Sequence, residues 1–104
     1  MASYTMWDQG GLHVWVSWRD DGELLIEGQD LRSGPFGATE YEYAVTVPTA
    51  QLPKLVAALG LETDDEVIAY LLANGESIVK QGERTWVEGL GISPGFWSRI
   101  EFDD

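Results

Sequence analysis

Residues 12–28, which read LHVWVSWRDDGELLIEG, decide the fold that the sequence predicts. The first half of this stretch alternates between two faces with the two-residue period of a β-strand. Asp20-Asp21-Gly22 then turns the chain, and residues 23–28 alternate as a returning strand. The stretch therefore predicts an antiparallel hairpin. Its apolar face carries Leu12, Val14, Val16, Trp18, Leu24 and Ile26.

Two further strands are predicted from the same two-residue period. Residues 40–47 place tyrosines and valines on one face and glutamates, alanine and threonine on the other. Pro48 ends this strand because proline has no N–H for the hydrogen-bonded ladder. A loop at residues 33–37 precedes it, and residues 96–102 form a last strand that we expect to return to the sheet.

Between these strands the apolar period lengthens to that of a helix. A first helix is predicted around residues 52–59, with Gly60 as its left-handed cap. A second begins at the capping box of residues 63–66 and ends before Asn74. A third covers residues 77–90 and is weakened by Gly82.

These elements predict one α+β domain over residues 1–104, in the order β-β-β-α-α-α-β. The sheet is expected to be mainly antiparallel and to be packed by two or three helices.

The charge of the chain narrows the classes of partner. Eighteen Asp and Glu residues against six Lys and Arg give a formal net charge of −12. A charge of this size repels nucleic acid and anionic membranes and attracts basic surfaces. The chain also contains 44% hydrophobic residues and five tryptophans, which distinguishes it from acidic disordered tails. We therefore expect a folded domain with a basic partner.

Residues that carry chemistry are scarce. The chain has no cysteine and one histidine, His13, so thiolate metal sites, disulfides and nucleophilic triads lack their components. Gly10-Gly11 and residues 34–37 do not complete a phosphate-binding loop. We therefore expect no enzymatic activity, no metal and no cofactor. With no signal-like start and no long apolar run, we also expect no membrane contact and a cytoplasmic location.

Six acidic residues are candidates for partner contact because they lie on the hairpin, a loop and a strand, where no helix cap explains them. By contrast, Asp64-Asp65-Glu66 compensates the macrodipole at a helix start. The six candidates are Asp20, Asp21, Glu23, Asp30, Glu40 and Glu42.

Trp15 is a further candidate, as an aromatic anchor of the interface. It shares a face with His13 and Ser17, opposite the more apolar face of the strand. The alternative is that Trp15 belongs to a second small core beneath helices that cover both faces of the sheet.

A resemblance supports the choice of partner. The string GELLIEGQDL at residues 22–31, followed by EYEY at residues 40–43 and Leu59-Gly60, resembles small acidic proteins of unassigned function from high-GC bacteria. In its general character the chain is similar to the immunity proteins of polymorphic or contact-dependent toxin systems. That resemblance implies that a carboxylate-rich face plugs the basic site of a nuclease. Because immunity proteins are diverse in fold, it implies no particular residues.

The sequence therefore predicts a non-enzymatic protein that neutralises a basic partner, by preference a nuclease toxin. Its carboxylates would meet the Lys and Arg that otherwise hold phosphates, with electrostatic steering of association. The first alternative is a phage-type inhibitor that mimics DNA with rows of carboxylates. The second is a small hydrolase that uses a carboxylate pair, such as Glu40 and Glu42. The third is a structural subunit with a large apolar patch.

Overall fold

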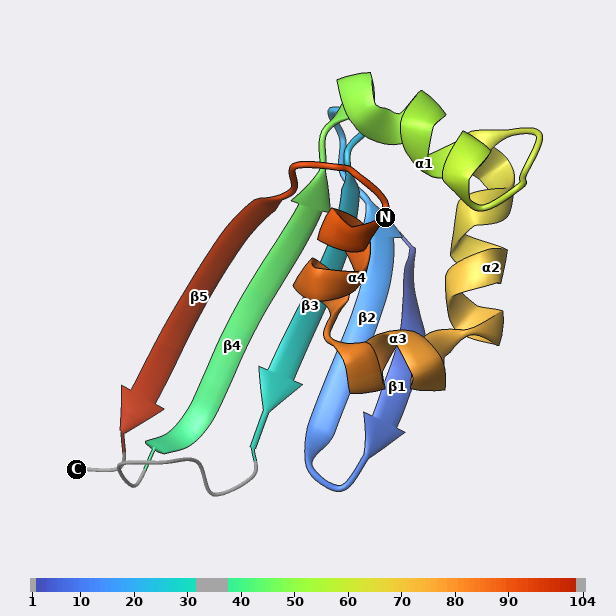
Figure 1. Cartoon of the computed structure of the whole chain (residues 1–104). Helices are drawn as coiled ribbons and strands as arrows, with labels where there is room; N and C mark the ends of the chain where they lie inside the picture. The colour runs from blue at the N-terminus through green and yellow to red at the C-terminus, as the bar shows by residue number, and fades with distance from the viewer. Residues whose placement is uncertain (1, 32–37, 103–104) are drawn as a thin grey trace.

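The sheet is an antiparallel meander in which strands follow one another in chain order. The computed structural model describes residues 2–31 and 38–102. Within these residues, five strands pair in the order β1-β2-β3-β4-β5 (Figure 1). Their bounds are Ser3–Gln9 for β1, Leu12–Trp18 for β2, Leu24–Asp30 for β3, Ala38–Val47 for β4 and Gly95–Phe102 for β5. The predicted antiparallel α+β fold is confirmed, and the loop predicted at residues 33–37 lies outside the described residues.

The central hairpin forms as the sequence predicts. Trp18 pairs with Leu24 at the turn, and Leu12 pairs with Asp30 at the far end of the two strands. The turn is closed by hydrogen bonds from the Gly22 amide to the Arg19 carbonyl at 2.9 Å and from the Arg19 amide to the Glu23 carbonyl at 2.8 Å. The two-residue period thus identified both strands and the face of each that is buried.

Strand β1 corrects the predicted order, which began with residue 12. It pairs with β2 through the two-residue turn Gly10-Gly11, whose φ angles of 64° and 88° suit a type I′ hairpin. The register shifts between Thr5 and Trp7, so Met6 is the extra residue of a bulge. This bulge interrupts the alternation that would have revealed the strand.

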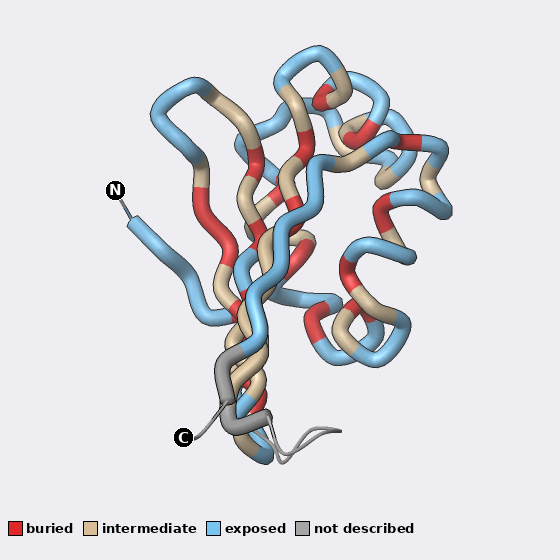
Figure 2. The backbone as a smooth tube through the Cα atoms, turned by 90° about the vertical axis from the view of Figure 1, so that its left-hand side faces the viewer, coloured by how far each residue is buried: buried red, intermediate tan, exposed pale blue. Residues whose placement is uncertain are grey.

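The helices lie on one side of the sheet and the core lies between the two layers (Figures 1 and 2). The helices are α1 (Leu52–Ala58), α2 (Val67–Ala73), α3 (Gly75–Gln81) and α4 (Glu83–Gly89). None of them is long and apolar enough to cross a membrane, within the part of the chain that is described. The largest fully buried core side chains are Leu24, Ile26, Leu55, Leu71 and Ile78.

Two predicted helix boundaries need correction. The helix predicted over residues 77–90 is two helices, because Gly82 adopts a φ of 96° that ends α3 and lets α4 begin in a new direction. The helix predicted from residue 63 begins at Val67 instead, and a short 3₁₀ turn at Asp64–Glu66 precedes it. The Thr63 hydroxyl lies 3.4 Å from a Glu66 carboxylate oxygen, and neither side chain caps the backbone there.

The cap predicted at Gly60 is confirmed. Gly60 has a φ of 70°, and its amide donates to the Ala57 carbonyl while the Leu61 amide donates to the Val56 carbonyl. This is the pair of bonds of a Schellman motif.

One polar contact ties the helical layer to the middle of the sheet. The Tyr43 hydroxyl on β4 donates to the Glu83 carboxylate at the start of α4, at 3.0 Å. The Tyr43 ring covers Gly28, its cross-strand partner on β3, so closely that a Cβ there would overlap the ring. Burial raises the pKa of Glu83, which is 5% exposed, and burial together with the nearby Glu83 also raises the pKa of Tyr43. Gly28, Tyr43 and Glu83 therefore form a clamp that joins β3, β4 and α4.

Gly28→Ala is expected to lower the free energy of unfolding by about 1–3 kcal/mol, because the added methyl displaces the Tyr43 ring. Gly89→Ala is the matched control: it lies in α4, has a negative φ and meets no atom within 4 Å, so it should be neutral or stabilise by about 0.5–1 kcal/mol. Urea unfolding of both variants measures the difference. Equal effects would show that the ring does not need a glycine beneath it.

Glu83→Gln tests the buried carboxyl through the pH dependence of stability. Because folding raises the pKa of Glu83, the folded state keeps its proton where the unfolded chain has lost it. The stabilising contribution of the protonated Glu83 carboxyl is therefore complete below the ordinary glutamate pKa, and it is lost as pH rises through the raised pKa. The stability of Glu83→Gln relative to the parent protein should increase over this window. Urea unfolding from about pH 4 to about pH 8 measures the free energy of unfolding of both proteins. A difference between them that does not change with pH would contradict the raised pKa of Glu83.

Candidate functional site

The face of the sheet opposite the helices carries the candidate site. Figure 2 shows the helices on one side of the strands, and among the described residues no helix covers the other side. One cross-strand row on this open face runs from Trp15 on β2 through Glu27 on β3 and Ala44 on β4 to Trp97 on β5. An antiparallel sheet can leave such a face in water when its side chains are partly polar. The alternative of a second core over Trp15 is therefore not formed by any described helix.

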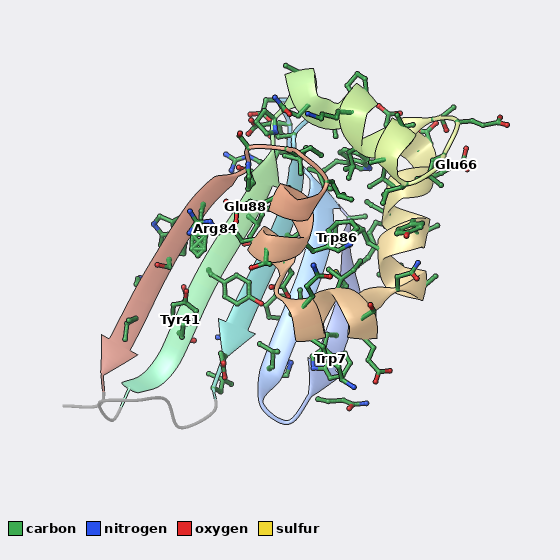
Figure 3. The ribbon with its side chains drawn as sticks, viewed as in Figure 1. Trp7, Tyr41, Glu66, Arg84, Trp86 and Glu88 are labelled. Atoms are coloured by element: carbon green, nitrogen blue, oxygen red, sulfur yellow. The ribbon has the colours of Figure 1, made fainter. Side chains whose placement is uncertain are left out.

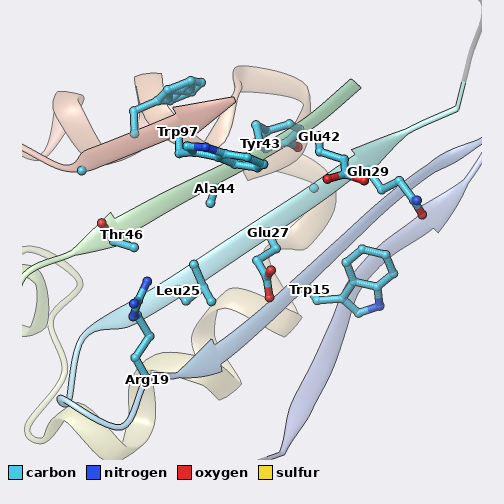
Figure 4. Close-up of a pocket in the computed structure, with 13 residues that line it drawn as sticks. Trp15, Arg19, Leu25, Glu27, Gln29, Glu42, Tyr43, Ala44, Thr46 and Trp97 are labelled. Carbon is cyan, nitrogen blue, oxygen red and sulfur yellow. The ribbon is translucent and has the colours of Figure 1, made fainter. Parts of the chain in front are cut away.

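A groove of about 720 Å³ follows this row (Figure 4). Its walls carry the two tryptophans, while Ala44 is the smallest side chain between them and Glu27 stands in the centre. Leu25, Thr46 and Arg19 lie toward one end and Gln29 and Glu42 toward the other. Trp97 is 52% exposed, whereas Trp15 is half-buried. The groove thus combines apolar walls with a charged centre.

Trp15 is held in place by two neighbours on the open face. Its indole stacks on the imidazole of His13, with ring centroids 5.9 Å apart and planes at 12°. His13 Nδ1 in turn lies 2.7 Å from a carboxylate oxygen of Asp8 on β1. These two contacts give His13 a role in positioning the wall of the groove.

The carboxylates of the groove differ in their surroundings. The Gln29 amide donates to Glu40, and Glu42 faces Arg99 across the β4–β5 pair. Glu27 is exposed and, within the described residues, takes part in no ion pair or side-chain hydrogen bond. Its cross-strand neighbours are an indole and a methyl group. Within the described residues Glu42, which also lines the groove, likewise has no ion pair or side-chain hydrogen bond, and Glu27 is the carboxylate that stands in the cross-strand row between the two indoles.

The six acidic residues predicted as one site fall in three places. Asp20, Asp21 and Glu23 lie in the β2–β3 turn, where the Glu23 amide donates to Asp21 at 3.0 Å. Glu40 and Glu42 lie on the open face of β4, in the half of this ten-residue strand that is remote from the β2–β3 turn; the whole strand is about 30 Å long. Asp30 shares the helix-side face of β3 with Ile26 and interacts electrostatically with Tyr43.

Sequence reasoning missed Glu27 and Trp97 as site residues. Both belong to the polar side of a correctly predicted alternation, so the signal was present in the pattern. What it lacked was the order of the strands, which brings β5 next to β4 and Trp97 beside Ala44. The acidic residues alone were too numerous to select one.

No group of three or more metal-ligating side chains occurs in residues 2–31 and 38–102. A second, shallower groove of about 650 Å³ lies between the hairpin turn and α1, with Leu52, Val56 and Leu61 in its lining. It lacks aromatic walls. No family model, curated protein or solved structure matches the chain.

Trp97→Ala is expected to lower the free energy of unfolding by less than about 1 kcal/mol, because half of this side chain is in water. Trp86→Ala is the comparison, since Trp86 packs against the core from α4 (Figure 3), and it should cost at least about 2 kcal/mol. Urea unfolding measures both. Equal losses would assign Trp97 to the core instead of to a binding surface.

Proposed function

We propose that this protein is a non-enzymatic, cytoplasmic binding protein that neutralises a basic partner, by preference a nuclease toxin as an immunity protein does. The observation that carries the proposal is the open sheet face, where Trp15 and Trp97 flank an uncompensated carboxylate in a chain of net charge −12. Aromatic residues in a partly apolar depression are typical hot spots of protein interfaces. The excess of acid steers a basic surface toward that face.

The open face supports a basic protein partner better than it supports DNA mimicry or a hydrolase. A DNA mimic requires continuous rows of carboxylates, whereas this face interleaves Glu27 and Glu42 with Arg19, Arg99 and the two tryptophans. A carboxylate-dependent hydrolase requires an acid with a raised pKa in its cleft. Glu83 is the described carboxyl whose pKa is raised, and it lies under α4 on the opposite side of the sheet.

The test begins with the proteins encoded beside the gene of this chain. One of them is expected to be a nuclease that this protein inhibits in a stoichiometric complex. Association should slow at least about tenfold between roughly 50 mM and 150 mM salt, while dissociation changes less, because the attraction is screened before contact. Stopped-flow mixing measures the association and dissociation rates, and nuclease assays measure the inhibition.

Paired charge reversals locate the interface. Glu27→Lys with Glu42→Lys should weaken the complex at least about a hundredfold, on the scale of broken interfacial charge pairs. Asp65→Lys with Glu66→Lys makes the same change in net charge at the start of α2 and should weaken it far less. Equal losses of affinity in the two double variants would show that binding depends on net charge and not on the open face. A neighbouring nuclease that is neither bound nor inhibited would contradict the proposal.

A further inference from the structure

We propose that the groove on the open face is a subsite for a single arginine side chain of the basic partner. The guanidinium would pair with the Glu27 carboxylate and stack against the indoles of Trp97 and Trp15. This inference rests on the proposed binding function and specifies the chemistry of its contact.

The spacing of the strands sets the size of the subsite. Trp15 and Trp97 stand on β2 and β5 in one cross-strand row, three strand intervals apart. Adjacent strands lie about 4.8 Å apart, so the two Cα atoms are separated by about 14 Å. The Trp97 indole lies over Ala44 and narrows this interval from one side, with Glu27 between it and Trp15 (Figure 4). The interval left between the indoles is therefore narrower than the separation of the two Cα atoms, and one planar group would occupy it.

The lining selects arginine over lysine. A guanidinium is planar, stacks on aromatic faces and presents paired N–H donors that match both oxygens of a carboxylate. An ammonium is a compact and strongly hydrated charge that uses an indole wall less well. The groove offers one carboxylate between two indoles, an arrangement that a guanidinium uses more fully than an ammonium does.

The basic residues at the two ends of the groove limit the subsite to one cation. Arg19 lines one end, with its Nε 3.9 Å from a Glu23 carboxylate oxygen; Arg99 lies outside the lining, as the cross-strand partner of Glu42 at the other end. Both would repel further basic residues on either side of the bound arginine. The segment of the partner that enters the groove should therefore carry neutral or acidic residues next to its arginine.

The experiment titrates short peptides into the isotopically labelled protein and follows the indole N–H signals by nuclear magnetic resonance. The probes are acetyl-Gly-Arg-Gly-amide and the same peptide with lysine or with uncharged citrulline in place of arginine. The arginine peptide should shift the signals of Trp15 and Trp97. The lysine peptide should bind several-fold more weakly, and the citrulline peptide at least about tenfold more weakly because it loses the charge-assisted bonds.

Three variants complete the test. Glu27→Gln should weaken the arginine peptide at least about tenfold. Glu62→Gln, the same change at an exposed residue between α1 and α2, should leave the affinity unchanged. Ala44→Val fills the floor of the groove with a residue that strands favour, and should block the peptide while the protein stays folded.

The outcomes separate this inference from the proposed function. Equal binding of arginine and citrulline peptides, or an affinity unchanged by Glu27→Gln, would overturn the subsite. Tighter binding of a peptide with aspartate in place of arginine would also overturn the subsite, because Arg19 would then be the recognition group. A nuclease partner bound equally well by Glu27→Gln and Ala44→Val would also overturn it and leave the binding function standing. Arginine binding that requires Glu27 supports the subsite even if no neighbouring nuclease is found.

Discussion

The packing of the Tyr43 ring on Gly28 is the constraint on which the rest of the structure depends. Only a residue without a side chain lets the ring lie flat on β3, and only from there does its hydroxyl reach the buried carboxyl of Glu83. The contact fixes α4 over the middle of the sheet and aligns β3 with β4. Because side chains alternate along a strand, the same alignment sets Glu27 beside Ala44 on the opposite face.

The two faces of the sheet therefore differ: one packs against the helices and the other is open to solvent. The helix side is closed by aliphatic side chains, and burial there raises the pKa of Glu83. The open side keeps its acids in water, next to aromatic walls that a folded core would normally conceal. Asp8 and His13 hold Trp15 in position without burying it. In the proposed function the side chain of Trp15 would lose little entropy on binding, because this indole is already oriented.

The net charge of the chain and the composition of the groove around Glu27 are separate properties. Many of the acidic residues are exposed, and some belong to local pairs on helices, such as Glu76 with Lys80 at 2.7 Å and Glu88 with Arg84 at 3.9 Å. Such pairs contribute little to stability, and the remaining charge acts over distance as a field. Glu27 differs from the other acids in its neighbours: it stands between an indole and a methyl group. In the proposed function, steering would come from the whole surface and recognition from this one position.

The sequence by itself determined what depends on neighbouring residues: the period-two strands, the hairpin at residues 12–28, the cap at Gly60 and the net charge. Only the tertiary structure showed β1, whose alternation is interrupted by the bulge at Met6. It also showed that Gly82 divides one predicted helix in two, and that Asp20 and Glu42 lie far apart. It also brought Trp97 to the row of Trp15. The physical reason is that alternation along a strand follows from backbone geometry, whereas the order of strands follows from packing between residues distant in sequence.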